Sequence, residues 1–426
     1  MDIGIEIYSL CKELFPINRS ITGDGVRETL SIIKREIPEL HISEIDTGSQ
    51  CFDWIVPQEW KCEVAYIIDP EGNKICDFSQ NNLHVVGYSE SVDKSMTLDE
   101  LEEHLYSLSE LPDAVPYITS YYKRRWGFCI SDTERKLLKK GKYKVYIRSD
   151  LFDGSLTYGE VLIPGNTREE IFFSTYVCHP SMANNELSGP AVVTSLVKYI
   201  KSLKNRRYSY RVIFIPETIG SIVYLSKNIN TMQKYMVAGF NVSCVGDDND
   251  YGYLPSRTGK TVSDKVAVHV LNHQVLNYTK YSFLQRGSDE RQYCSPNVNL
   301  PVSCITRSKY GEYKEYHTSL DNLDFISPSG LAGAYKVYAR VIELLEHNYA
   351  YKPILFCEPQ LGKRDLYPTL GVRDRKDDFV QNMLNFLAYC DGALDLIEVA
   401  DEIKVPAWEL FEIINVLLEN KLIERV

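Results

Sequence analysis

The stretch that decides the fold is residues 171–200, IFFSTYVCHPSMANNELSGPAVVTSLVKYI. It begins with a short run that is apolar except for a Ser-Thr pair, as in a buried strand, and ends with apolar residues at helical spacing. Between them lies a polar loop that contains His179, Asn184, Asn185 and Glu186. This order places polar side chains at the carboxyl end of a strand, where open α/β sheets bind their ligands.

Strands and helices alternate over the surrounding segment, residues 151–350. The predicted strands include 212–215, 238–245 and LPVSCITR, and the predicted helices include 221–228 and 329–347. Alternation on this scale predicts a mixed, mostly parallel sheet covered by helices, which is the α/β class.

The first 45 residues predict two amphipathic helices, at 3–14 and 26–37. The loop between them, NRSITGDG, contains Arg19. Two interpretations remain open: the loop caps the second helix, or Arg19 contacts an anionic group of a substrate. We assign residues 1–45 and 150–355 to one discontinuous catalytic domain.

Residues 46–149 have a sequence pattern typical of β structure and predict a small inserted domain. The sequence favours a hairpin that turns at residues 70–73, with further strands at LHVVGYS and YKVYIRSD. Thr97 and Glu100 resemble a capping box, which predicts a helix over 97–108. Two aromatic segments, Asp53-Trp54 and WGFC, are read as either pocket wall or core.

Residues 356–426 predict a third domain with the pattern of a winged helix. The predicted recognition helix, 407–419, carries Glu409, Glu412 and Glu419 and no Lys or Arg. Because binding along a phosphate backbone needs basic groups, we expect no direct DNA binding. We expect instead a protein partner or a homo-oligomer contact through this domain.

Composition restricts the function further. The 426 residues carry a net charge of −11, which gives no general attraction to nucleic acid or to an anionic membrane. The first residues do not resemble a signal peptide, and no apolar run approaches the length of a membrane span. The 11 cysteines lack CxxC spacing, so we expect reduced thiols in a cytoplasmic protein.

Candidate metal ligands follow several of the predicted strands: His179, Glu186, Glu217 and His317. A catalytic zinc takes three protein ligands from such residues and leaves one position for water. The ion lowers the pKa of that water to about 7, and a nearby carboxylate can act as general base. Asp247 and Asp248 are interpreted as loop or cap residues, and His269 and His273 as surface or core histidines.

Four motifs in this order, CHPSMANNELSG, IPETIGS, FNVSCVG and YHTSLDNLDF, resemble those of the zinc aminopeptidase family that also includes the glutaminyl cyclases. The resemblance covers residues 1–45 and 150–350, and it implies a three-layer α/β sandwich with a zinc site. With NRSITGDGVR, SDERQYCSP and the winged helix, the whole chain is similar to a bacterial aminopeptidase-like family often linked to surface-polysaccharide gene sets.

Three positions depart from the pattern of the zinc aminopeptidases. Where that family has a bridging Asp, a second Glu and a strand-end Asp, this sequence has Asn185, Thr218 and Ser243. A two-zinc centre would lack its neutralising carboxylates, so we expect one zinc ion.

Two sets of ligands for this ion can be written. The favoured set is His179, Glu186 and His317, with Glu217 as the base. The alternative set is His179, Glu217 and His317, with Glu186 as the base.

Further residues are expected to support the site or to contact the substrate. Asp289 in GSDERQY is expected either to orient His317 or to bind a substrate amine. Arg291 lines the site or pairs with a core carboxylate, and Tyr316 donates to an oxyanion or packs in the core. Asn185 and Arg19 complete this group.

These residues predict zinc-dependent hydrolysis of a peptide or small amide bond, on a peptide amino terminus, an aminoacyl group on a sugar, or another small amide. The competing interpretation is a catalytically altered aminopeptidase scaffold with a regulatory or interaction role through the winged helix. A third is acyl transfer of the glutaminyl cyclase kind.

Overall fold

The computed structural model describes residues 2–366 and 377–426. The chain divides into two compact units, one formed by residues 1–263 and 279–336 and the other by residues 264–278 and 337–426. Each unit is described separately below.

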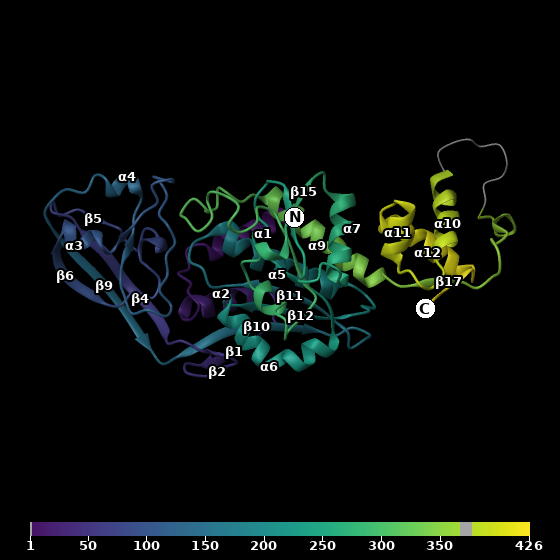
Figure 1. Ribbon diagram of the computed structural model, residues 1–426, viewed down its shortest axis with the longest axis horizontal. Coiled ribbons are helices and arrows are strands. Elements are labelled where there is room, and N and C mark those ends of the chain that lie inside the picture. Colours follow the sequence, from purple (N-terminus) through teal and green to yellow (C-terminus); the bar gives the residue numbers. More distant parts are fainter. Residues whose placement is uncertain (1, 367–376) are drawn as a thin grey trace. The chain divides into compact units, whose positions relative to one another are not determined.

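The first unit is built on an eight-stranded sheet with the order β1-β10-β12-β11-β13-β16-β14-β15 (Figure 1). The four strands β12, β11, β13 and β16 are parallel, whereas β1, β10 and β14 pair antiparallel at the two sides. The bounds are β1 His41–Asp46, β10 Ser155–Ile163, β11 Glu170–Tyr176, β12 Ser209–Ile215, β13 Met236–Asn241, β14 Tyr251–Leu254, β15 Tyr278–Lys280 and β16 Val302–Thr306. The mixed sheet of the α/β class is therefore confirmed, with its parallel part in the centre.

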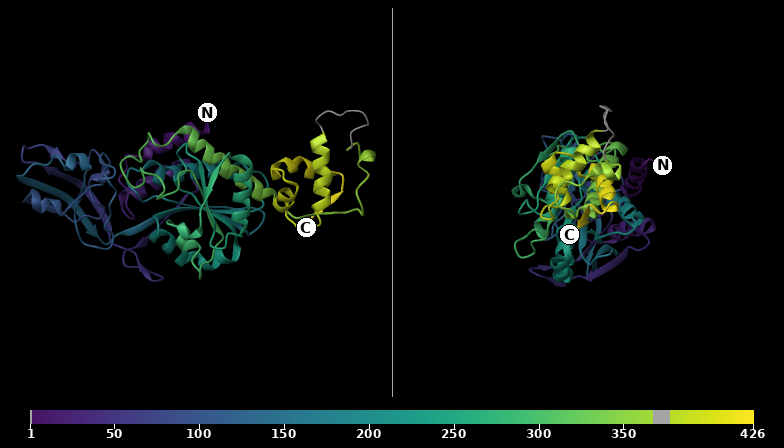
Figure 2. Two further views of the ribbon diagram at one scale, coloured as in Figure 1. Left: turned by 45° about the horizontal axis from the view of Figure 1, so that its top comes forward. Right: turned by 90° about the vertical axis from the view of Figure 1, so that its right-hand side faces the viewer.

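Helices cover both faces of this sheet (Figures 1 and 2). The chain crosses from β11 to β12 through α5 (Ser188–Ser202) and returns from β12 to β13 through α6 (Ile219–Tyr235). Since parallel crossovers are right-handed, steps in opposite directions put these helices on opposite faces, which gives three layers. The amino-terminal helices α1 (Ile3–Leu14) and α2 (Asp24–Glu36) contact α5 and β10 respectively.

Two predicted elements in this unit differ in length from the observed ones. The strand predicted at 238–245 ends at Asn241, and residues from Val242 onward leave the sheet as a buried loop. The helix predicted at 221–228 extends over Ile219–Tyr235. The chain is buried where β13 ends, and burial obscures the periodicity that marks an element's end. The added part of α6, residues 229–235, is instead mostly half-buried or exposed.

The segment predicted as an insertion forms its own antiparallel sheet, β5-β4-β9-β6. Its strands are β4 Glu59–Ile68, β5 Lys74–Ile75, β6 Val92–Thr97 and β9 Lys142–Phe152, with shorter pairs β2 Gln50–Cys51 and β3 Trp54–Ile55, and β7 Leu105–Tyr106 and β8 Phe128–Cys129. The hairpin at 70–73, the strand YKVYIRSD and the capping box at Thr97 are confirmed. The domain boundaries at 46–149 stay a prediction.

Two other predictions for this segment are wrong. LHVVGYS forms no strand, because a 3₁₀ turn occupies Asn82–His84 and only isolated bridges follow. The helix predicted over 97–108 is α3, Leu98–Glu102, after which the chain pairs as β7. A short helix α4, Asp132–Arg135, precedes β9.

In the described residues, the carboxy-terminal part of the second unit forms a group of α-helices and one strand pair. The helices are α10 Asp377–Tyr389, α11 Leu396–Ile403 and α12 Leu410–Glu419, and β17 Tyr351–Pro353 pairs with β18 Ile423–Arg425. Apolar side chains of α11 and α12, such as Leu396 and Ile413, form its core. The unit also holds most of α7, Val262–Gln274, while α9, Pro328–His347, runs from the first unit into the second.

None of the helices in the described ranges combines the length and the apolar character that crossing a bilayer requires.

Candidate functional site

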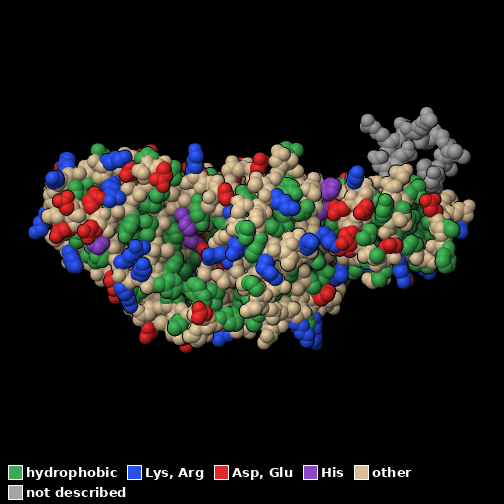
Figure 3. Space-filling view, in the orientation of Figure 1, with side chains coloured by type: hydrophobic (Ala, Val, Ile, Leu, Met, Phe, Trp, Pro, Cys, Tyr) green, Lys and Arg blue, Asp and Glu red, His purple; other side chains and the backbone are tan. Residues whose placement is uncertain are grey.

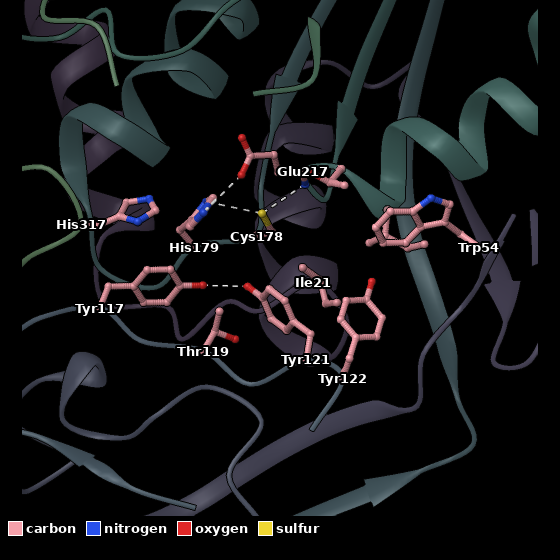
Figure 4. A pocket seen from close by; sticks show the side chains of 12 residues that line it. Ile21, Trp54, Tyr117, Thr119, Tyr121, Tyr122, Cys178, His179, Glu217 and His317 are labelled. Carbon is pink, nitrogen blue, oxygen red and sulfur yellow. Dashed lines mark hydrogen bonds and ion pairs between the residues drawn. The ribbon is translucent and has the colours of Figure 1, made fainter. Parts of the chain in front are cut away.

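The candidate site is a cavity of about 240 Å³ in the first unit, at the carboxyl ends of β11 and β12 (Figure 4). His179 follows β11, Glu217 follows β12, and His317 lies in the loop after β16. The lining residues are Ile21, Trp54, Tyr117, Thr119, Tyr121, Tyr122, Cys178, His179, Glu217, Thr218, Ile219 and His317. Three groups named from the sequence therefore face one cavity.

His179 has a carboxylate beside each ring nitrogen. Nδ1 lies 2.8 Å from Glu186 Oε2, and Nε2 lies 3.6 Å from Glu217 Oε2. Burial alone would lower the pKa of His179, but the adjacent Cys178 and Tyr117 and the hydrogen bond to Glu186 raise it well above its ordinary value. Since Glu186 takes Nδ1, only Nε2 remains to meet a ligand in the cavity.

Glu186 lies behind His179 and does not line the cavity. Its side chain is fully buried, and Oε1 lies 3.6 Å from Nε of Arg19, which is also fully buried. Arg19 Nε donates to the backbone oxygen of His179 at 2.9 Å. Arg19 therefore neither contacts a substrate nor caps a helix at the surface; it supports Glu186 and His179 from within the core.

This geometry bears on the ligand set that the sequence favoured, which stays a prediction. A carboxylate on Nδ1 orients an imidazole whose other nitrogen binds a metal. Glu186 is placed for this orienting role and not beside Nε2 as a ligand. Glu186 is also not among the cavity-lining residues, which disfavours it as the base of the alternative set.

Glu217 is the one carboxylate that lines the cavity. The Ser288 hydroxyl donates to Glu217 Oε1 at 2.6 Å, which fixes the carboxylate with Oε2 towards His179. Burial raises the pKa of Glu217, while His179 and the Ser288 hydrogen bond oppose that shift. A carboxylate whose pKa is raised is a better proton acceptor than an ordinary one.

His317 faces the same cavity with an unusual backbone conformation, φ = 55°. Its Nε2 is buried and has no hydrogen-bond partner within the part of the chain that the structure describes. Burial, helped by nearby His179, lowers the pKa of His317 to about 3, so the ring is neutral. A neutral imidazole with a free buried nitrogen fits a metal ligand.

The inserted segment supplies one wall of the cavity. Tyr117 packs edge-on against His179 and His317, at centroid distances of 5.4 and 5.2 Å, and its backbone N–H donates to the His317 oxygen at 2.8 Å. The Tyr117 and Tyr121 hydroxyls are 2.7 Å apart. These two tyrosines were not predicted as site residues from the sequence. The feature that could have indicated them is the aromatic run YITSYY in an otherwise irregular stretch.

The two aromatic segments singled out in the sequence differ in their placement. Trp54 lines the cavity, as the pocket-wall interpretation of Asp53-Trp54 has it. Trp126 of WGFC instead stacks on His104, with 3.6 Å between the ring centroids, and does not line the cavity.

Asp289 and Arg291 lie beside Glu217 without lining the cavity. Asp289 Oδ1 accepts hydrogen bonds from the Thr218 backbone at 2.7 Å and the Ser221 hydroxyl at 2.9 Å, and Arg291 Nη2 donates to Thr218 Oγ1 at 3.0 Å. Burial and the charge of Glu217 raise the pKa of Asp289 to about 8. Both residues therefore hold Thr218, whose φ is 62°, in the turn that presents Glu217.

The remaining expected residue, Tyr316, stacks on the ring of His317 with 3.9 Å between the centroids. It is not among the cavity-lining residues, so it supports His317 rather than facing a substrate.

The three positions that depart from the zinc aminopeptidases are filled by neutral groups: Asn185 and Ser243 are buried, and Thr218 lines the cavity. Asn185 Oδ1 accepts from the Tyr176 hydroxyl at 2.8 Å, and Ser243 is 2% exposed. Asn185 lies on a π-helical turn, Ala183–Leu187, whose backbone N–H groups at 184 and 185 are capped by Asp321. These neutral groups supply no carboxylate to a second zinc ion, whereas His179 and His317 are donors of the kind that hold one, with Glu217 beside them in the cavity.

Ligand atoms within 4.8 Å of one another form two clusters in the described residues: Cys178 with His179 and Glu186, and His269 with His273 and Asp401. In the second, His269 Nδ1 lies 2.6 Å from Asp401 Oδ1, and Nε2 accepts the Ala407 N–H at 2.9 Å. Both ring nitrogens are already used, which agrees with the core interpretation of His269. Asp247 and Asp248 accept hydrogen bonds from the Ser308 and Ser329 hydroxyls, as loop and helix-entry residues do.

The fold defines an aminopeptidase-like α/β protein with a carboxy-terminal winged helix. Crystal structures of an M28 peptidase precursor from Shewanella amazonensis and of a zinc aminopeptidase from Bacillus subtilis share the fold, with TM-scores of 0.58 and 0.57 at 13% identity. Each alignment covers 80% of this chain, and 93% and 94% of the other chain.

The chain belongs to the family described as "Domain of unknown function (DUF4910)", whose model matches residues 8–348, and a winged helix-turn-helix model matches residues 350–425. It is 46% identical to a Clostridium acetobutylicum protein named "Putative polysaccharide biosynthesis protein with aminopeptidase-like domain", over 94% of this chain and 91% of that protein. A crystal structure of a "putative peptidase" from the same organism has a TM-score of 0.93 at 43% identity and covers 99% of this chain and 96% of its own.

Proposed function

We propose that the cavity is the active site of a zinc-dependent hydrolase of a peptide or small amide bond, with one zinc ion. The observation that carries the proposal is that His179, His317 with its free Nε2, and the single carboxylate Glu217 line one cavity. Bound there, zinc would polarise a carbonyl group and lower the pKa of a water molecule.

The chain's own groups have distinct roles in this proposal. His179 and His317 are the imidazole donors, and Glu186 holds His179 with Nε2 towards the cavity. Glu217 accepts the proton of the attacking water at Oε2 and returns it to the leaving amine. Ser288 keeps that oxygen turned towards the cavity by holding Oε1.

The test is zinc content and amide hydrolysis in the wild type and in Glu217→Gln and His317→Ala variants. We expect one zinc per chain in the wild type, loss of zinc in His317→Ala, and retained zinc in Glu217→Gln with turnover reduced by about 10²–10⁴-fold. Loss of zinc in Glu217→Gln would show that Glu217 is a third ligand. Full activity in that variant would end the proposal.

The biological setting we propose follows the name of the 46% identical relative, an aminopeptidase-like protein of polysaccharide biosynthesis. The amide would then belong to a precursor or an aminoacylated sugar, handled in the cytoplasm. The check is the amount of cell-surface polysaccharide in a deletion strain. A deficiency that the wild type restores and Glu217→Gln does not would support this setting.

A second candidate function is a catalytically altered scaffold that acts through the winged helix. Two observations favour it: Asn185, Thr218 and Ser243 replace carboxylates, and the face of α12 carries Glu412 and Glu419 instead of cations. The partner would then be a protein or a second copy of the chain, not DNA. Purified wild type that holds no metal after zinc is supplied would favour this function over hydrolysis.

A further inference from the structure

A second cavity adjoins the candidate active site. It has a volume of about 130 Å³ and shares Tyr121 and Tyr122 with the first cavity. Its other polar walls are Gln58, Ser120, Lys123 and Arg124. The two cavities are therefore neighbours at Tyr121 and at the exposed Tyr122.

The two cavities differ in charge. The first is lined by no Lys or Arg, and its single carboxylate, Glu217, would repel an anionic group placed beside it. The second presents Lys123 and Arg124, which come from the segment YYKRRW in a chain whose net charge is −11. Figure 3 shows Lys and Arg side chains on the rim of a hollow where hydrophobic side chains surround histidine.

The two cations are available to a ligand. Lys123 makes no ion pair among the residues that the structure places. Arg124 donates to the Gln58 amide oxygen and lies 3.9 Å from Glu90, too far for a direct hydrogen bond, so part of its guanidinium remains open. An arginine fork next to a lysine is a common arrangement for binding carboxylate or phosphate.

Tyr121 and Tyr122, which line both cavities, are fixed by contacts with other aromatic side chains. Tyr121 packs edge-on against Tyr88, with 5.2 Å between centroids, and its hydroxyl bonds Tyr117. Tyr122 packs against Trp54 at 6.0 Å. The first cavity is smaller than the roughly 300 Å³ at the low end of drug-sized ligand sites, so it suits one residue-sized group.

We infer that the substrate of this site is an amide with an anionic group, carboxylate or phosphate, that lies past Tyr121 and Tyr122 against Lys123 and Arg124. The inference rests on the proposed function for the amide bond itself. The charged group adds selectivity because only the second cavity offers cations to an anion, whereas Glu217 in the first cavity would repel it.

The experiment measures binding rather than turnover, in wild type and in Glu217→Gln, by calorimetry with four carboxy-terminally blocked dipeptides. Alanyl-aspartate and alanyl-phosphoserine are the anionic probes, and alanyl-asparagine and alanyl-serine are their neutral partners. We expect each anionic probe to bind about tenfold more tightly than its partner, with a preference that weakens as salt rises. The two anionic arms distinguish a carboxylate from a phosphate.

A Lys123→Gln/Arg124→Gln variant should lose the preference, while a matched Lys140→Gln/Lys142→Gln variant, with the same change in net charge at another cavity of the inserted segment, should keep it. Equal binding of anionic and neutral probes, no binding of any probe, or a preference that survives Lys123→Gln/Arg124→Gln would overturn the inference. A preserved preference in a protein that hydrolyses no amide would refute the proposed hydrolysis and leave the anion site standing.

Discussion

Glu186 Oε2 lies 2.8 Å from His179 Nδ1, on the side of the imidazole away from the cavity. The same carboxylate lies 3.6 Å from Nε of the buried Arg19. The cavity-facing histidine is thus backed by a buried carboxylate and a buried cation, which together fix the direction of Nε2.

The first prediction concerns the Glu186→Gln variant. The amide can still accept from His179, but Arg19 becomes a buried charge without a counter-ion, so we expect the free energy of unfolding to fall by about 3–5 kcal/mol. Zinc affinity should fall by about 10–100-fold, because the orienting charge on His179 is lost. Urea unfolding and zinc titration measure the two effects.

Glu13→Gln is the matched control, since Glu13 pairs with Arg35 at the surface, with side chains 42% and 55% exposed. It should change neither quantity noticeably. If Glu186→Gln behaves like this control, the buried pair does not support the site.

The second prediction concerns Gly189, where the polar loop becomes α5. A Cβ here would lie 2.5 Å from both Thr175 Oγ1 and the Val242 backbone oxygen. Gly189→Ala should therefore lower the free energy of unfolding by about 1–3 kcal/mol, as overpacking does. Gly362→Ala, where nothing lies within 4 Å, is the control and should be close to neutral in the same urea titration. If Gly189→Ala left the free energy of unfolding unchanged, the surrounding loop would be able to shift and accommodate the added methyl group.

The third prediction is a pH dependence of stability caused by Asp321. Burial raises the pKa of this carboxyl from 3.8 to about 6, although backbone N–H groups at 184 and 185 and Tyr313 oppose the shift. Between these values the unfolded chain has lost the proton and the folded chain keeps it. The stabilising contribution of protonated Asp321 to the free energy of unfolding is therefore present below pH 4. It is lost as pH rises to about 6, and the total loss is about 3 kcal/mol.

The measurement is the difference in unfolding free energy between wild type and Asp321→Asn, which does not titrate, over pH 4 to 7. The free energy of unfolding of the wild type should fall relative to that of the variant as pH rises. A difference that is constant or grows with pH would contradict the raised pKa.

The fourth prediction separates the cavity from the histidine cluster in the second unit. His269→Ala leaves Ala407 N–H and Asp401 without their partner, so the unfolding free energy should fall by about 1–3 kcal/mol. Zinc content should stay that of the wild type, because neither nitrogen of His269 is free for a metal. If zinc content fell in His269→Ala and stayed at the wild-type level in His317→Ala, the metal site would have to be assigned to the second unit.

The sequence predicted the sheet and the winged helix well, because each rests on a local pattern. β11 and α5 follow from periodicity in residues 171–200, and His179, Glu217 and His317 follow from their places after strands. The role of Glu186 did not follow, since spacing cannot say which nitrogen of His179 a residue on a π-helical turn approaches. Tyr117 and Tyr121 were missed because they reach the site from an irregular segment without periodicity.

The backbone of His317 depends on residues about 200 positions earlier in the chain. Residues 115–117 pair with residues 317–319 through the Pro116–Thr318 bridge, the Ser319 N–H to Val115 oxygen bond and the Tyr117 N–H to His317 oxygen bond. A chain shortened to the α/β body would keep both histidines and yet lose the ladder that holds one of them at positive φ. The insertion and the α/β body are therefore structurally coupled through the loop around His317.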